Sequence, residues 1–137
     1  MEWVTALFSE TRPGTVLIID DSESTAAPLE IALSVLENVQ VMVLSSAIDA
    51  LKVLNDSQEN VIAVVTDLHL PLMNGLELIV EIRASMRHRE IPVIVVSGDS
   101  NSTTRGDAFQ SGANAYFPKP YSPVHIRNEL ERLLHAS

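Results

Sequence analysis

The chain has 137 residues, which is enough for one domain with its own core but leaves no room for a second. Its 18 acidic residues against 9 Lys and Arg give a net charge of −9, which argues against nucleic acid as a partner because the phosphates would be repelled. The absence of cysteine excludes disulfides and fits a cytoplasmic protein, and no apolar run is long enough to span a membrane.

Five short apolar segments rich in Val and Ile are predicted to form strands. Three of them are continuously apolar, which is typical of strands buried on both faces of a parallel sheet. The second segment alternates more between apolar and polar residues, so we expect it nearer an edge of the sheet. The segments are 15–19, 39–44, 61–65, 91–96 and 113–117.

Between these segments, apolar residues recur three or four positions apart, which predicts helices with one buried face. Alternating strands and helices indicate an α/β fold: a (βα)5 three-layer sandwich with one parallel sheet. Pro28 falls inside the first helical pattern, where it is harmless if Thr25 is the N-cap and Pro28 lies in the first turn. The fourth helix, about 102–111, contains two threonines and Gly106, so we expect it to be short or mobile.

Residues whose side chains can bind ligands or react lie at the carboxyl ends of the predicted strands, where open parallel sheets bind their ligands. The first strand is followed by Asp20 and Asp21, the third by Asp67, the fourth by Ser97 and the fifth by Lys119. Each residue taken singly has an ordinary explanation as a turn former, a helix cap or a solvated charge. Those explanations do not account for the occurrence of all these residues at the same edge of the sheet. They also leave three carboxylates close together, where they repel one another.

A divalent cation would relieve that repulsion, because Asp20, Asp21 and Asp67 offer the hard oxygen ligands that suit Mg²⁺. The cation would also neutralise an incoming phosphate held in line with a carboxylate nucleophile. An oxygen of Asp67 attacking phosphorus would form an acyl phosphate. Lys119 and Ser97 would then pair with the phosphoryl oxygens.

In this order and spacing, the residues resemble the response-regulator receiver family of two-component signalling over about residues 14–135. The acidic pair after the first strand looks like the family's metal-binding pair, and segment 67–78 like its phosphoacceptor with the following proline and glycine loop. Ser97 stands at the Ser/Thr switch position and Tyr116 at that of the aromatic switch residue. Segment 117–121 resembles the terminal Lys-Pro motif, whose peptide bond is usually cis in the family.

The resemblance implies a flavodoxin-like or CheY-like sheet with strand order 2-1-3-4-5. It divides the chain into an N-terminal extension, residues 1–13, and a single-domain receiver, residues 14–137. We expect the extension to be a loosely docked tail. The alternative is an added contact in a homodimer, since its exposed Trp3 and Phe8 would be costly to leave in water.

The resemblance also assigns roles in the site. Asp67 would be the phosphorylated residue, and Mg²⁺ would be bound directly by Asp21, Asp67 and the backbone carbonyl of His69. Asp20 would act mainly through metal-bound water. Lys119 would grip the phosphoryl group.

Ser97 would be the second residue, after Lys119, to hold the phosphoryl group. In this family its hydroxyl swings toward the phosphate. The ring of Tyr116 would follow inward and reshape the face formed by the fourth helix, the fifth strand and the fifth helix. A phosphate has the differential contacts that such a two-state change requires.

The function implied by the family is a phosphoacceptor switch without enzymatic activity beyond its own phosphorylation and dephosphorylation. The phosphoryl group would come from a sensor histidine kinase or a phosphotransfer protein, and the output would go to an unidentified downstream protein. The alternative is a phosphate-shuttle intermediate in a multi-step relay.

Two residues of the site stand at positions that vary within the family. His69 lies two residues after the phosphoacceptor, and Asp99 two after Ser97. In the family these variable positions flank the path of the attacking water and tune the phosphoryl lifetime; Asp99 would either repel or orient that water. For His69, a loop residue with no role beyond its carbonyl is an equally good explanation. The surface is the expected place of His88, His125 and His135.

Three other classes of protein fit less well. A haloacid-dehalogenase-type phosphatase would need a second acid where His69 stands, and its nucleophile usually follows the first strand. An FMN binder would need a Ser/Thr/Gly phosphate loop where Asp20 and Asp21 stand. A purely structural adaptor with a dead site would more often lack one of the five key residues, and all five are present.

Overall fold

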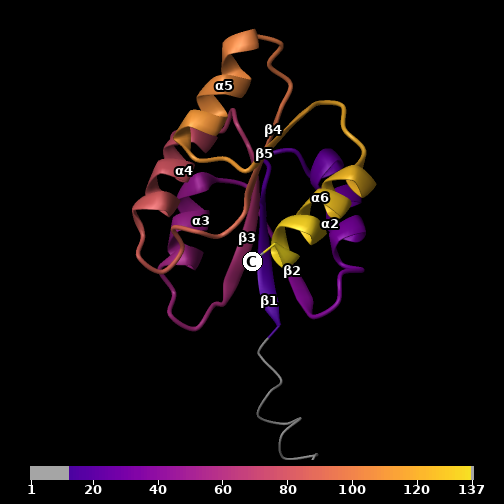
Figure 1. Ribbon diagram of the computed structural model, residues 1–137, viewed down its shortest axis with the longest axis vertical. Coiled ribbons are helices and arrows are strands. Elements are labelled where there is room, and N and C mark those ends of the chain that lie inside the picture. Colours follow the sequence, from indigo (N-terminus) through magenta and orange to yellow (C-terminus); the bar gives the residue numbers. More distant parts are fainter. Residues whose placement is uncertain (1–12, 137) are drawn as a thin grey trace, which may run out of the picture.

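The computed structural model describes residues 13–136, and in them a five-stranded parallel sheet lies between two layers of helices (Figure 1). The strand order β2-β1-β3-β4-β5 confirms the predicted topology. The strands are β1 Gly14–Ile19, β2 Val39–Leu44, β3 Val61–Asp67, β4 Val93–Ser97 and β5 Ala115–Pro118. The helices are α2 Glu23–Leu33, α3 Ala47–Leu54, α4 Gly75–Ala84, α5 Ser102–Ser111 and α6 Pro123–His135.

Residues 1–12 of the predicted N-terminal extension, and with them its predicted dimer contact, lie outside the described residues, as does residue 137. Within residues 13–136, no helix is long and apolar enough to cross a bilayer.

The alternation of side chains along β1 divides the core between the two faces of the sheet. Val16 and Ile18 pack with α2 and α6 on one face. Leu17 and Ile19 pack with α3, α4 and α5 on the other. All four side chains are almost completely buried, as expected for a strand covered on both sides. The more exposed β2 is an edge strand, as predicted.

Strand register explains why the polar strand ends meet. Ile19 of β1 pairs with Thr66 of β3, so that the residues that follow them, Asp20 and Asp67, come side by side. Asp67 in turn pairs with Val96 of β4. One residue further along, Ser97 is level with Pro118 of β5, the residue before Lys119. The parallel sheet therefore brings all four strand ends to one edge.

The predicted N-cap of the first helix is wrong. The helix begins at Glu23 with Ser22 as its N-cap residue, and Pro28 lies inside it, beyond the first turn. Thr25 lies in the first turn, and its hydroxyl donates to Asp20 Oδ2, at 2.5 Å, and to the carbonyl of Ser22, at 3.1 Å. The first turn of this helix is thus in contact with the acidic pair that follows β1.

The fourth predicted helix, α5, forms over its whole predicted range, Ser102–Ser111. Its ends compensate for its poor helix propensity. The Asn101 side chain accepts a hydrogen bond from the N–H of Thr103 at the N-terminus, and Gly112 ends the helix with a left-handed φ of 119°.

The predicted surface position of one histidine, His88, is wrong. His88 is buried, with 4% of its surface exposed, because it lies in the turn that follows α4, where Ser85 Oγ is 3.5 Å from its Nδ1. Burial, aided by the charge of Arg87, lowers its pKa. His125 and His135 are exposed on α6, as expected.

Candidate functional site

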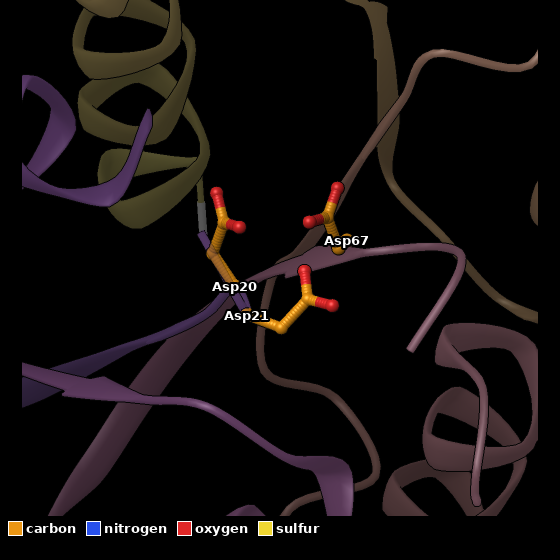
Figure 2. Close-up of side chains that lie close together, drawn as sticks. All are labelled: Asp20, Asp21 and Asp67. Atoms are coloured by element: carbon orange, nitrogen blue, oxygen red, sulfur yellow. The ribbon is translucent and has the colours of Figure 1, made fainter. Parts of the chain in front are cut away.

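Three carboxylates meet at the carboxyl end of the sheet (Figure 2). One oxygen each from Asp20, Asp21 and Asp67 lies within 4.8 Å of the other two. Asp20 and Asp67 are buried, with 5% of each residue exposed, whereas Asp21 faces solvent. Hard oxygen donors this close together, partly open to water, are a fitting donor set for a divalent cation.

The ammonium of Lys119 joins this cluster. Its Nζ lies 2.7 Å from Asp67 Oδ1 and 3.9 Å from Asp20 Oδ2. The backbone fixes its position, since the N–H of Lys119 donates to the carbonyl of Ser97 at 2.8 Å. The peptide bond to Pro120 is cis, as the resemblance led us to expect. The predicted convergence of this lysine with the acids is therefore present.

Asp67 is the most perturbed acid of the cluster. Burial raises its pKa from 3.8 to about 6, and the nearby Asp20 carboxylate adds to the rise. The hydrogen bond from Lys119 works in the opposite direction and favours the ionised form. A cation bound among the acids would favour it further, because it would offset the repulsion between them.

The start of α2 holds Asp20 in place. Asp20 Oδ1 accepts a hydrogen bond from the N–H of Ser22 at 2.8 Å, and Oδ2 accepts one from the Thr25 hydroxyl. The supporting role of Thr25 was missed from the sequence. The available signal was a hydroxyl in the first turn of a helix that directly follows an acidic pair.

Packing between α4 and β3 fixes the backbone at Asp67. A Cβ on Gly75 would lie 2.4 Å from the carbonyl oxygen of Asp67, so only glycine allows this approach. The N–H of Gly75 also donates to the carbonyl of Leu68, at 2.8 Å. A capping box in which Asn74 and Glu77 bond each other's backbone N–H starts the helix at this point.

The predicted switch residues lie together around the loop after β4. Ser97 is buried, and its Oγ accepts from the N–H of Asp99 at 3.0 Å. The Tyr116 hydroxyl donates to the Asp99 carbonyl at 3.5 Å. His69 Nε2 lies 3.1 Å from Asp99 Oδ2, so its side chain is engaged with the next loop. The interaction links the two variable positions identified in the sequence.

Arg105 of α5 lies over the ring of Tyr116, the predicted aromatic switch residue. Its guanidinium lies 5.8 Å from the ring centre of Tyr116 and 5.4 Å from that of Phe109. Both distances suit a cation–π contact. Sequence analysis missed Arg105, and nothing in the sequence marks its contact with a ring on the next strand.

Comparison with known proteins agrees with this geometry. The family model described as response regulator receiver domain matches residues 16–131. The chain belongs to the response regulator receiver domain family. It is 30% identical to the chemotaxis protein CheY1 of Helicobacter pylori over 119 residues, which are 87% of this chain and 95% of that one. It is 32% identical to the two-component response regulator ORR5 of rice, Oryza sativa, over 121 residues, or 87% of each chain.

A solved structure shares the fold. The signal receiver domain of a signal transduction histidine kinase from Syntrophus aciditrophicus matches with a TM-score of 0.78 and 26% identity. The match covers 88% of this chain and 89% of that one. This receiver domain is thus one of those that act in two-component systems, where the partners are histidine kinases or phosphotransfer proteins.

Proposed function

We propose that this receiver domain takes a phosphoryl group onto Asp67, with Mg²⁺ as cofactor, and returns it to water. The observation that carries the proposal is the position of Lys119, 2.7 Å from one oxygen of Asp67 within a cluster of three acids. The contact with Lys119 still leaves the three acids with more negative charge than one ammonium offsets. A divalent cation would balance that remaining negative charge and would also offset the charge of an incoming phosphoryl group.

The metal would be held by Asp21, Asp67 and the backbone carbonyl of His69, with Asp20 acting through metal-bound water. Mg²⁺ is proposed because every donor in this set is a hard oxygen. When bound, it supplies positive charge that offsets the charge of the incoming phosphate. The carboxylate spacing of at most 4.8 Å supports one ion shared by the acids.

In the proposed reaction, an oxygen of Asp67 attacks the phosphorus of a phosphohistidine. The new P–O bond forms as the P–N bond breaks, and the electron pair stays on the donor imidazole, which is then protonated. Lys119 and Ser97 would hold the phosphoryl oxygens as charge develops on them. In the later dephosphorylation, water attacks phosphorus as the bond to Asp67 breaks, so that Asp67 leaves as a carboxylate and inorganic phosphate departs.

The switch would then involve Ser97 and Tyr116 and reshape the surface formed by α5, β5 and α6. The donor is proposed to be a sensor histidine kinase or a phosphotransfer protein, and the output a further protein. A relay role, in which the phosphoryl group passes to another histidine, stays a prediction, because the same site would serve both roles. The cytoplasmic location, the homodimer and the absence of any further enzymatic activity also stay predictions.

Labelling with a small phosphodonor tests the proposal. With acetyl phosphate and Mg²⁺, intact-mass spectrometry should show one added phosphoryl group on the wild type and none on Asp67→Asn. Asp107→Asn changes an exposed acid of α5 and should be labelled like the wild type. Equal labelling of the Asp67 variant, or no labelling of the wild type with Mg²⁺ present, would refute the proposal.

A further inference from the structure

We propose that Thr25 is a positioning residue that keeps the ammonium of Lys119 beside Asp67. The inference rests on the proposed function and deepens it, because Lys119 can hold the phosphoryl oxygens only if it stays next to the acceptor. Thr25 lies in the first turn of α2 and acts through its hydrogen bond to Asp20.

Two donors face the same oxygen of Asp20. Oδ2 accepts a hydrogen bond from the Thr25 hydroxyl at 2.5 Å and lies 3.9 Å from Lys119 Nζ. The other oxygen, Oδ1, accepts from the N–H of Ser22 at 2.8 Å. Both oxygens of this buried carboxylate are therefore bonded without help from the lysine. The ammonium donates instead to Asp67 Oδ1, at 2.7 Å.

The two buried carboxylates compete for this one ammonium. A buried carboxylate oxygen that loses its donor is costly until another donor takes its place. Without the Thr25 hydroxyl, the ammonium of Lys119 is the group that can replace it, because Nζ already lies 3.9 Å from Asp20 Oδ2. The hydroxyl of Thr25 thus decides which of the two acids the lysine serves.

The side chain of Lys119 has room for such a shift. A cavity of about 480 Å³ lies between the start of α2 and the segment after β5, and its lining includes Thr25, Lys119 and Pro120. The N–H of Lys119 is bonded to the carbonyl of Ser97, so the side chain moves and the backbone stays. A movement of Nζ by about 1 Å would bring it within hydrogen-bond distance of Asp20.

The segment that carries the lysine also contacts Thr25. The carbonyl of Thr25 accepts from the Tyr121 hydroxyl at 3.5 Å, and Tyr121 follows Lys119 by two residues. On the helix side, the Thr25 hydroxyl lies 3.1 Å from the carbonyl of Ser22. The bond to Asp20 is the shorter of its two bonds and the one that meets a charge. The hydroxyl is therefore held in place from both sides of the site.

Crystal structures of the wild type and of Thr25→Val, grown in EDTA without a phosphodonor, test the inference directly. Valine keeps the branched shape of threonine but has no hydroxyl to donate. In the variant, Lys119 Nζ should lie within about 3.2 Å of Asp20 Oδ2. Ser24→Ala is the matched control: it removes a neighbouring hydroxyl that lies 3.0 Å from another serine, so the contact of Lys119 with Asp67 should not change. Wild-type distances around Nζ in the Thr25 variant would overturn the inference.

The rate of phosphoryl labelling gives a second readout. With acetyl phosphate and Mg²⁺, Thr25→Val should be labelled about tenfold more slowly, a smaller loss than removal of the ammonium itself would cause. Thr25→Ser keeps the hydroxyl and should be labelled at the wild-type rate, as should Ser24→Ala. In a Lys119→Met background, Thr25→Val should cause no further loss, because the ammonium that it misdirects is gone.

The combined variant separates this role from a merely structural one. A tenfold loss that persists in the Lys119→Met background would show that Thr25 acts without the lysine, which overturns the inference. A wild-type rate in Thr25→Val, or a slow rate in Thr25→Ser, would overturn it as well. If the wild type is not labelled at all, the proposed function itself fails, and the crystal structures still decide where Thr25 directs the ammonium.

Discussion

The Nζ of Lys119 lies 2.7 Å from Oδ1 of Asp67 and 3.9 Å from Oδ2 of Asp20, so one ammonium faces both buried carboxylates. This contact offsets part of the negative charge of the three acids. It also places a hydrogen-bond donor beside the carboxylate that is the proposed phosphoryl acceptor. The third acid, Asp21, remains exposed at the edge of the cluster, where a cation from solvent reaches it.

Replacing this ammonium should separate phosphoryl transfer from metal binding. In Lys119→Met, the rate of labelling by acetyl phosphate should fall about 100-fold, because a donor to the developing charge is lost. Mg²⁺ affinity, measured by calorimetry, should stay the same or rise, since a competing positive charge has been removed. Lys52→Met, which removes an exposed lysine of α3, should change neither quantity. An equal loss of metal binding in the Lys119 variant would contradict this division of roles.

The raised pKa of Asp67 predicts a pH-dependent cost in stability for the metal-free protein. The carboxyl titrates at about 6 when folded and near 3.8 ordinarily, so between these values the folded state binds more protons than the unfolded state. Its contribution to stability is complete below the unfolded pKa and is lost as pH rises through the folded one. Asp67→Asn does not titrate, so its unfolding free energy should gain about 2–3 kcal/mol on the wild type between about pH 4 and about pH 7.

Urea unfolding in EDTA measures this difference. Taking the variant relative to the wild type at each pH removes the contributions of all other titrating groups. The Asp107→Asn variant should show a difference that does not change with pH. A flat difference for the Asp67 variant would show that the buried carboxyl titrates normally.

Two glycines should respond to alanine in opposite ways. Gly75→Ala should destabilise the fold by about 1–3 kcal/mol, because the new Cβ would meet the Asp67 carbonyl at 2.4 Å. Gly106 lies inside α5 with no atom within 4 Å of a Cβ placed there, so Gly106→Ala should stabilise by about 0.5–1 kcal/mol. Denaturant unfolding compares the two variants, and a similar change in both would contradict the packing described at β3.

The fold could be predicted from the sequence because strands buried on both faces of a sheet appear as continuous apolar runs. Once the strands are parallel, their carboxyl ends share one edge, so the meeting of Asp20, Asp67 and Lys119 follows from position alone. The individual roles in the site come from the family resemblance and are not contained in that positional argument.

The features that could not be predicted share one physical cause: each depends on tertiary contacts and not on the local sequence. Ser22 and Thr25 are both good N-cap residues, and the helix begins after Ser22, with Thr25 in its first turn bonded to Asp20. The burial of His88 depends on how the turn after α4 packs, which its local sequence does not encode. Arg105 meets Tyr116 across two elements, a contact that no periodicity indicates.

Borohydride trapping is the most direct test of the central claim, that the carboxylate of Asp67 is the phosphoryl acceptor. Borohydride reduces an acyl phosphate at aspartate to homoserine, whereas a phosphohistidine is not converted, so the product identifies both the residue and the bond. After treatment with acetyl phosphate and Mg²⁺, peptide mapping should find homoserine at position 67 and nowhere else. Homoserine at position 20 or 21, or phosphoryl incorporation without any homoserine, would contradict the account.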